Sequence, residues 1–140
     1  MKQRGIIIAG GGLVGSALAI ALAREGIPVS VIDPLPQEKQ LEAGFDGRVS
    51  AIAIASKRIL ESIGAWQHVE RAEPIYDIRV MDGNAPMQVH FDHREIGREP
   101  FGYMVENQIL RRALFKATAE QANLHFIAGD EVTRFNAAPG

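Results

Sequence analysis

Short runs of β-branched residues and longer stretches with helical spacing alternate along the first part of the chain. Residues 4–9 predict a buried β-strand, and residues 29–33 predict a second strand of the same kind. Between them, apolar residues at helical spacing predict a helix over residues 13–25, which Gly26 ends. A strand, a helix and a strand in this order predict a βαβ unit with a parallel sheet.

The remaining pattern predicts further elements downstream of this unit. They are a mobile polar loop at 37–47, a helix at 50–63, a β-hairpin with strands at 76–82 and 87–91, a helix at 107–121 capped by Asn107, and a strand at 124–128. About ninety residues separate the second predicted strand from the last one. A simple nicotinamide-binding fold has one crossover helix at this point, whereas many FAD-binding proteins carry an insertion. The sequence therefore predicts an α/β, Rossmann-like FAD-binding fold with an inserted β-hairpin.

The turn after the first predicted strand has the pattern G-x-G-x-x-G, formed by Gly10, Gly12 and Gly15. Gly10 allows a tight turn, Gly12 lets a pyrophosphate approach the backbone, and Gly15 lets the helix pack closely on the strand. Leu13 and Val14 begin the helix, where backbone N–H groups and the helix dipole favour an anion. This pattern predicts that the N-terminal segment binds the ADP half of a dinucleotide.

Asp33 ends the second predicted strand, about twenty residues after the glycines. A carboxylate in this position accepts hydrogen bonds from ribose hydroxyls, and it would repel the 2′-phosphate of NADP. A signal peptide or a transmembrane helix over residues 1–23 is a weaker interpretation, because glycines interrupt the apolar run and the strand at 29–33 would be unexplained. A glycine-rich turn without any ligand is also a weaker alternative.

Composition narrows the function classes. The chain has 140 residues, which suits one compact domain, and its net charge of −2 offers no basic excess for nucleic acid. The chain has no cysteine, which excludes disulfides, thiol nucleophiles and thiolate metal sites and fits a reducing compartment. His90, Asp92 and His93 on the predicted hairpin have no further ligand in view, so we expect no metal site.

Three stretches together resemble a known family. They are residues 10–15 with Asp33, residues 46–53 (D-G-R-V-S-A-I-A) and residues 102–110 (G-Y-M-V-E-N-Q-I-L). The chain resembles the N-terminal part of the class A flavoprotein aromatic hydroxylases, the family that includes p-hydroxybenzoate hydroxylase. Within that family it is most similar to the ubiquinone-biosynthesis hydroxylases. The first stretch is shared by many flavoproteins, whereas the second and third narrow the choice to this group.

The resemblance implies FAD as cofactor, NAD(P)H as co-substrate and a small aromatic substrate. A polyprenylated substrate would bring this cytoplasmic enzyme to a membrane surface or a multi-enzyme complex. Arg48 matches a family arginine that contacts the ribityl–phosphate region of FAD. Asn107 matches a cofactor-contacting polar residue at the head of a helix, where many relatives have Arg or Gln, and Gln108 could take over that contact. The flavin carries the chemistry in this family, so we expect no catalytic residue within the chain.

Members of this family are much longer and carry two further cofactor motifs after this point. We therefore expect residues 1–140 to be a truncated, N-terminal part of the FAD-binding domain with little or no turnover of its own. Two alternatives stay open. One is another FAD- or NAD-dependent oxidoreductase, against which the Asp-Gly-Arg context of Arg48 argues. The other is a catalytically silent nucleotide-binding domain.

Overall fold

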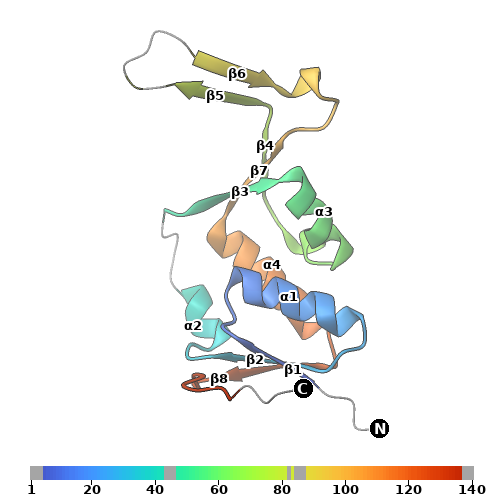
Figure 1. Ribbon diagram of the computed structural model, residues 1–140, viewed down its shortest axis with the longest axis vertical. Helices are drawn as coiled ribbons and strands as arrows, with labels where there is room; N and C mark the ends of the chain where they lie inside the picture. Colours follow the sequence, from blue (N-terminus) through green and yellow to red (C-terminus); the bar gives the residue numbers. More distant parts are fainter. Residues whose placement is uncertain (1–4, 43–46, 82, 84–87, 137–140) are drawn as a thin grey trace.

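The computed structural model describes residues 5–42, 47–81, 83 and 88–136 (Figure 1). The helices and strands are, in chain order, β1 (Ile6–Ala9), α1 (Leu13–Arg24), β2 (Val29–Asp33), α2 (Gln37–Glu42), β3 (Val49–Ala53), α3 (Ile54–Ser62), the 3-10 turn η1 (Trp66–His68), β4 (Glu73–Ile75), β5 (Asp77–Met81), β6 (Gln88–Asp92), the 3-10 turn η2 (His93–Glu95), β7 (Gly102–Glu106), α4 (Asn107–Ala119) and β8 (Leu124–Ala128).

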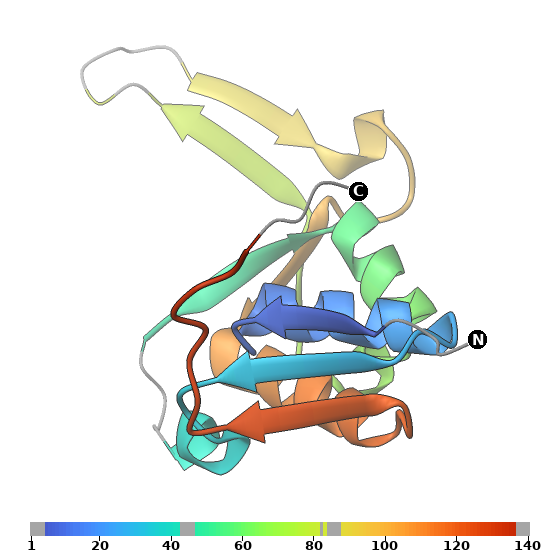
Figure 2. The ribbon, with the colours of Figure 1, turned by 60° about the horizontal axis from the view of Figure 1, so that its bottom comes forward.

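The predicted βαβ unit is confirmed. Strands β1, β2 and β8 form a parallel sheet in the order β1-β2-β8, and they run side by side in Figure 2. Helices α1 and α4 cover one face of this sheet. The prediction that the first strand is buried is wrong, because β1 lies at the edge of the sheet and Ile7 is 67% exposed on the face away from the helices.

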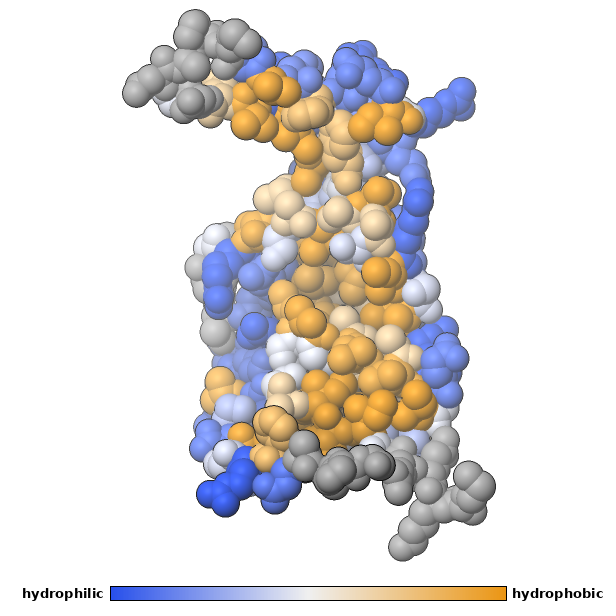
Figure 3. All heavy atoms as spheres, viewed as in Figure 1, coloured by the Kyte–Doolittle hydropathy of each residue, from blue (hydrophilic) through white to orange (hydrophobic). Residues whose placement is uncertain are grey.

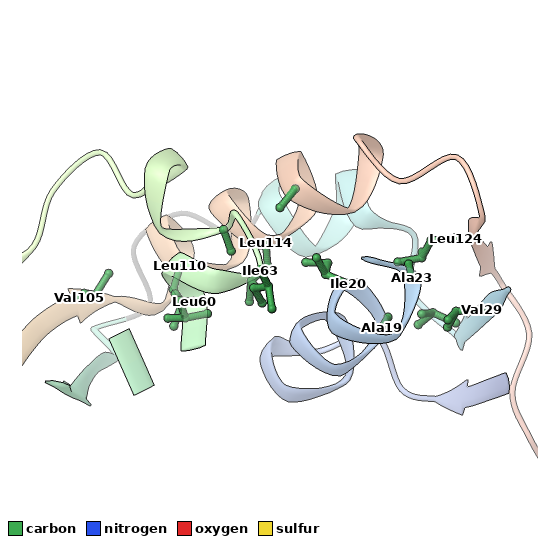
Figure 4. Packing of buried hydrophobic residues seen from close by; sticks show 13 residues of the cluster. Ala19, Ile20, Ala23, Val29, Leu60, Ile63, Val105, Leu110, Leu114 and Leu124 are labelled. Atoms are coloured by element: carbon green, nitrogen blue, oxygen red, sulfur yellow. The ribbon is translucent and has the colours of Figure 1, made fainter. Parts of the chain in front are cut away.

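The core lies between the parallel sheet and helices α1, α3 and α4 (Figure 4). Ile20 of α1 and Leu114 of α4 are almost fully buried and lie near each other, and Val29 of β2 lies farther along the core, beside Ala19 and Ala23. Trp66 lies against this core and contacts the ring of Tyr103 edge-on at 5.5 Å between centroids. Burial of these side chains fixes α1 and α4 relative to the sheet and so positions the loop between β1 and α1.

A second, antiparallel sheet has the order β3-β7-β4. Its first strand corrects the predicted helix at 50–63, because residues Val49–Ala53 form β3 and only Ile54–Ser62 form α3. Strand β3 pairs with β7, about fifty residues later in the chain, and the approach is close. A Cβ atom on Gly102 would lie 2.3 Å from the carbonyl oxygen of Ile52. This long-range pairing overrides the local helical pattern.

The predicted mobile loop at 37–47 is also corrected. Residues Gln37–Glu42 form the short helix α2, which packs against α4, while residues 43–46 lie outside the described part of the chain. The side chain of Gln40 is buried and fastens α2 to the end of β2. Tertiary hydrogen bonds therefore hold this helix, because six residues are too few for a helix to be stable alone.

The predicted hairpin is confirmed as β5 paired with β6, and it projects from the body of the molecule (Figure 1). Ile78 lies opposite Phe91 and Val80 lies opposite Val89, so these four apolar side chains share one face. The predicted turn at 83–86 lies outside the described residues except for Gly83. Within the described residues, no helix is long and apolar enough to cross a membrane.

Candidate functional site

The glycine loop between β1 and α1 has little room on its inner side and open space on its outer side. Gly10 has a φ of +100°, which favours glycine, and a Cβ atom on Gly15 would lie 1.9 Å from the Gly10 carbonyl oxygen. By contrast, a Cβ atom on Gly12 would meet nothing within 4 Å. The loop therefore presents bare backbone outward at Gly12, where a ligand could approach closely.

Gly11 packs closely on the sheet, which the sequence interpretation missed. A Cβ atom on this residue would lie 2.4 Å from the ring of Phe126 on β8, so the loop packs directly on the sheet. The carbonyl oxygen of Gly11 accepts a hydrogen bond of 3.0 Å from the buried Ser16 hydroxyl. The sequence does show three consecutive glycines at residues 10–12. Within that run, however, the G-x-G-x-x-G motif assigns a role only to Gly10 and Gly12.

Helix α1 begins at Leu13 with Gly12 as its N-cap and has no side-chain cap and no acidic residue in its first turn. The N–H groups of a first helical turn have no partner within the helix, and together with the helix dipole they attract anions. Leu13 is half-buried, while Val14 is 83% exposed on the outer side of the helix. This end of α1 has the electrostatics for a pyrophosphate.

Asp33 turns its carboxylate toward the glycine loop. Its Oδ2 accepts a hydrogen bond of 2.7 Å from the backbone N–H of Gly11, although 22 positions separate the two residues. Its Oδ1 accepts from the backbone N–H of Leu35 at 2.8 Å and from Nε2 of Gln40 at 3.2 Å. Each carboxylate oxygen has two acceptor positions, so Oδ2 can take one more donor on the side of the loop. The geometry thus leaves acceptor capacity for a ribose hydroxyl.

Arg48 and Asn107 are neighbours in the structure. The backbone N–H of Asn107 donates to the carbonyl oxygen of Arg48 at 3.1 Å, and the Ser50 hydroxyl donates to Oδ1 of Asn107 at 2.6 Å. The side-chain amide nitrogen of Asn107 is the donor that this arrangement leaves for a ligand. The predicted capping role of Asn107 is wrong, because the N-cap of α4 is Glu106 and Asn107 is the first helical residue. Its side chain is tied to β3 instead.

An apolar groove of about 520 Å³ lies beside the glycine loop. Side chains from α1, β3, α3 and α4 line it, and Figure 3 shows hydrophobic residues gathered over this part of the molecule. Leu13, Val14 and Ser50 belong to its lining, so the groove connects the start of α1 with the strand that follows Arg48. The predicted site residues form two groups, the glycine loop with Asp33 and the pair of Arg48 and Asn107. Of these residues, Leu13 and Val14 line the groove.

His90, Asp92 and His93, the three residues considered above for a metal site, each have other contacts in the structure. Nε2 of His90 lies 2.7 Å from Oδ1 of Asp77, while the rings of His93 and Tyr76 are tilted at 51° to each other with their centroids 4.7 Å apart. Among the described residues, no group of three or more His, Cys, Asp or Glu could hold a metal ion. Asp92 is the N-cap of η2 and accepts hydrogen bonds from the side chain and the backbone N–H of Arg94.

Side-chain hydrogen bonds from Arg94, reinforced by its backbone N–H, hold the pKa of Asp92 well below the ordinary range of an aspartate. A carboxyl with a lowered pKa contributes stability above its unfolded pKa and loses that contribution only as the pH falls through its folded value. We expect Asp92 to stay ionised at about pH 3, where an ordinary aspartate is mostly protonated. Carboxyl ¹³C NMR would measure this, and the Arg94→Ala variant should raise the midpoint of Asp92 toward the ordinary value, because it removes the side-chain hydrogen bonds but keeps the backbone N–H. An ordinary midpoint in the unaltered chain would contradict the expectation.

The sequence profile of the FAD binding domain family matches residues 4–138. The chain belongs to the FAD binding domain family. FAD is therefore the cofactor of this domain, and the predicted flavoprotein fold is confirmed. The two groups of predicted site residues described above lie within the matched segment.

Curated relatives of this FAD binding domain confirm the resemblance seen in the sequence. Ubiquinone hydroxylase UbiL of Rhodospirillum rubrum is 49% identical over 114 residues, covering 81% of this chain and 26% of the relative. The 3-demethoxyubiquinol 3-hydroxylase of Escherichia coli is 38% identical over 115 residues, covering 80% of this chain and 29% of the relative. The chain therefore spans between a quarter and a third of the length of these relatives.

Solved structures share the fold of this FAD binding domain. The p-nitrophenol 4-monooxygenase PnpA of Pseudomonas putida superposes with a TM-score of 0.75 at 17% identity. This match covers 96% of this chain and 34% of the other. At 17% identity this similarity shows a shared fold and nothing more. The shared fold agrees with the parallel sheet and the helices that pack on it.

Proposed function

We propose that this chain is the N-terminal, FAD-binding part of a flavin-dependent monooxygenase that hydroxylates an aromatic ring in ubiquinone biosynthesis. The observation that carries the proposal is the hydrogen bond between the Gly11 N–H and the Asp33 carboxylate, beside the open face of Gly12. It joins a pyrophosphate-compatible loop to a ribose-compatible carboxylate in one site. The relatives named as ubiquinone hydroxylases support the choice of reaction.

Each predicted residue has a physical role in this proposal. The backbone at Gly12 and the N–H groups of Leu13 and Val14 bind the pyrophosphate, while Oδ2 of Asp33 accepts from the ribose. Arg48 neutralises phosphate charge near the ribityl chain, and the amide of Asn107 donates to the same region. The redox chemistry is supplied by FAD when it is bound, with NAD(P)H as reductant and O₂ as oxidant. The chain itself binds, orients and neutralises charge.

The substrate in this proposal is a small aromatic ring with a polyprenyl tail. Such a tail partitions into a lipid bilayer, so the enzyme would work in the cytoplasm against a membrane surface or within a multi-enzyme complex. The relatives' names support a ubiquinone precursor as the aromatic part. The tail and the membrane contact rest on the chemistry of that substrate class.

Two measurements test the proposal. Isothermal titration of the purified chain with FAD and with ADP should give binding to one site for both ligands. The second measurement is NADPH oxidation in the presence of a quinol precursor. A full-length relative such as ubiquinone hydroxylase UbiL should oxidise NADPH in a substrate-dependent way, whereas this chain should show little or no oxidation. Failure of the chain to bind either nucleotide, or robust turnover by the chain alone, would refute the proposal.

Replacing Arg48 with alanine is expected to weaken FAD binding about tenfold while leaving AMP binding unchanged. A charge-assisted hydrogen bond to phosphate contributes about 1.5–3 kcal/mol, but AMP lacks the flavin-side phosphate of FAD that Arg48 faces in this proposal. Titration calorimetry with both ligands measures the difference. Arg58→Ala is the matched control, since Arg58 pairs with Glu99 on the surface. Equal losses for AMP and FAD would show that Arg48 acts elsewhere.

A further inference from the structure

Gln40 connects the candidate ribose-binding carboxylate to the rest of the fold. Its side chain is only 8% exposed, although it lies on the short helix α2. The Nε2 group of Gln40 donates to Oδ1 of Asp33 at 3.2 Å and to the carbonyl oxygen of Leu35 at 2.9 Å. The amide is thus used for contacts at the end of β2, and its donors are directed by a buried and therefore ordered side chain.

The main chain of Gln40 makes the second half of the connection. Its carbonyl oxygen accepts hydrogen bonds from Nε2 of Gln108 at 3.4 Å and from Nη1 of Arg111 at 3.2 Å, both on α4. Helix α4 begins with Asn107, the residue next to Gln108. Gln40 therefore stands between the Asp33 end of the site and the Asn107 end, and it is held from both sides.

We propose that Gln40 is a positioning residue that directs Oδ2 of Asp33 toward the ribose, an inference that rests on the proposed nucleotide site. The amide of Gln40 and the N–H of Leu35 together fill the two acceptor positions of Oδ1. Only Oδ2 then keeps an acceptor position, and it lies on the side of the glycine loop. Gln40 thereby fixes the rotation of the carboxylate and decides which oxygen the ligand meets.

The test compares ADP with 2′,3′-dideoxy-ADP, which lacks both ribose hydroxyls. We expect the unaltered chain to prefer ADP by about tenfold, because a hydrogen bond to a carboxylate is lost with the dideoxy ligand. Gln40→Met keeps the length of the side chain but removes its donors. It should weaken ADP about threefold to tenfold and leave dideoxy-ADP within twofold. Gln121→Met is the matched control, because its amide donates to the carbonyl oxygen of Ala117 near the C-terminal end of α4, away from Asp33.

The outcomes separate the inference from the proposed function. If the unaltered chain binds neither nucleotide, the proposed site itself fails. If it binds ADP and Gln40→Met weakens both ligands equally, or weakens neither, the site stands and the inference about Gln40 is overturned. Circular dichroism checks that the variant folds. Gln40→Glu is a second test, because glutamate has nearly the same shape as glutamine. It removes the amide donor and places a second carboxylate beside Asp33, so it should abolish the preference for ADP over dideoxy-ADP.

Discussion

Replacing Asp33 with alanine is expected to weaken ADP and FAD binding by about tenfold to a hundredfold, which corresponds to the 1.5–3 kcal/mol of a hydrogen bond to a charged group. The variant removes the proposed ribose acceptor. It also releases the backbone N–H of Gly11, which donates to Asp33 at 2.7 Å in the folded chain. Loss of that contact lets the glycine loop move away from the position in which it would meet the pyrophosphate.

Titration calorimetry with ADP measures the loss, and thermal unfolding shows whether the fold is intact. Asp77→Ala is the matched control, because Asp77 is an exposed hairpin carboxylate that pairs with His90 far from the glycine loop. The control should bind ADP as the unaltered chain does. Unchanged ADP binding in Asp33→Ala would remove the ribose role of Asp33 and, with it, the physical basis of the proposed site.

The parts of the site that could be predicted from the sequence are the parts with local causes. The glycine pattern and the acidic end of the second strand follow from short-range spacing, and the structure joins them through the contact between Gly11 and Asp33. The βαβ unit has the same origin, because the apolar periods that define its strands and helix are complete within 33 residues. The structure of a segment can be predicted from its sequence when its local preferences agree with the overall fold, as they do here.

The parts that could not be predicted depend on partners far along the chain. Residues Val49–Ala53 have a pattern that fits a helix, and they become a strand only because β7 supplies its hydrogen-bonding partner about fifty residues later. Helix α2 is polar and short, and its stability comes from contacts with β2 and α4. Gln40 belongs to no motif in the sequence. Its role becomes visible only when Asp33, Leu35 and α4 are placed around it.

Two glycines of the G-x-G-x-x-G motif are expected to respond in opposite ways to replacement by alanine, one losing stability and the other losing FAD binding. Gly15→Ala should destabilise the fold by about 3 kcal/mol or more, since overpacking of this kind costs 1–3 kcal/mol and sometimes more. The new methyl carbon would lie 1.9 Å from the Gly10 carbonyl oxygen, a backbone atom that cannot simply rotate away. Replacing a helical glycine by alanine ordinarily stabilises by up to about 1 kcal/mol, so the steric cost decides the sign.

Gly12→Ala should instead leave stability within about 1 kcal/mol, because Gly12 has a φ of −71° that alanine adopts freely and its Cβ would meet nothing within 4 Å. We expect the same methyl group to weaken FAD binding at least about tenfold, since it occupies the space through which the pyrophosphate approaches the backbone. Urea unfolding and FAD titration of both variants separate stability from binding. Unchanged FAD affinity in a stable Gly12→Ala variant would mean that the pyrophosphate does not contact this loop, whereas normal stability in Gly15→Ala would mean that α1 can move away from β1.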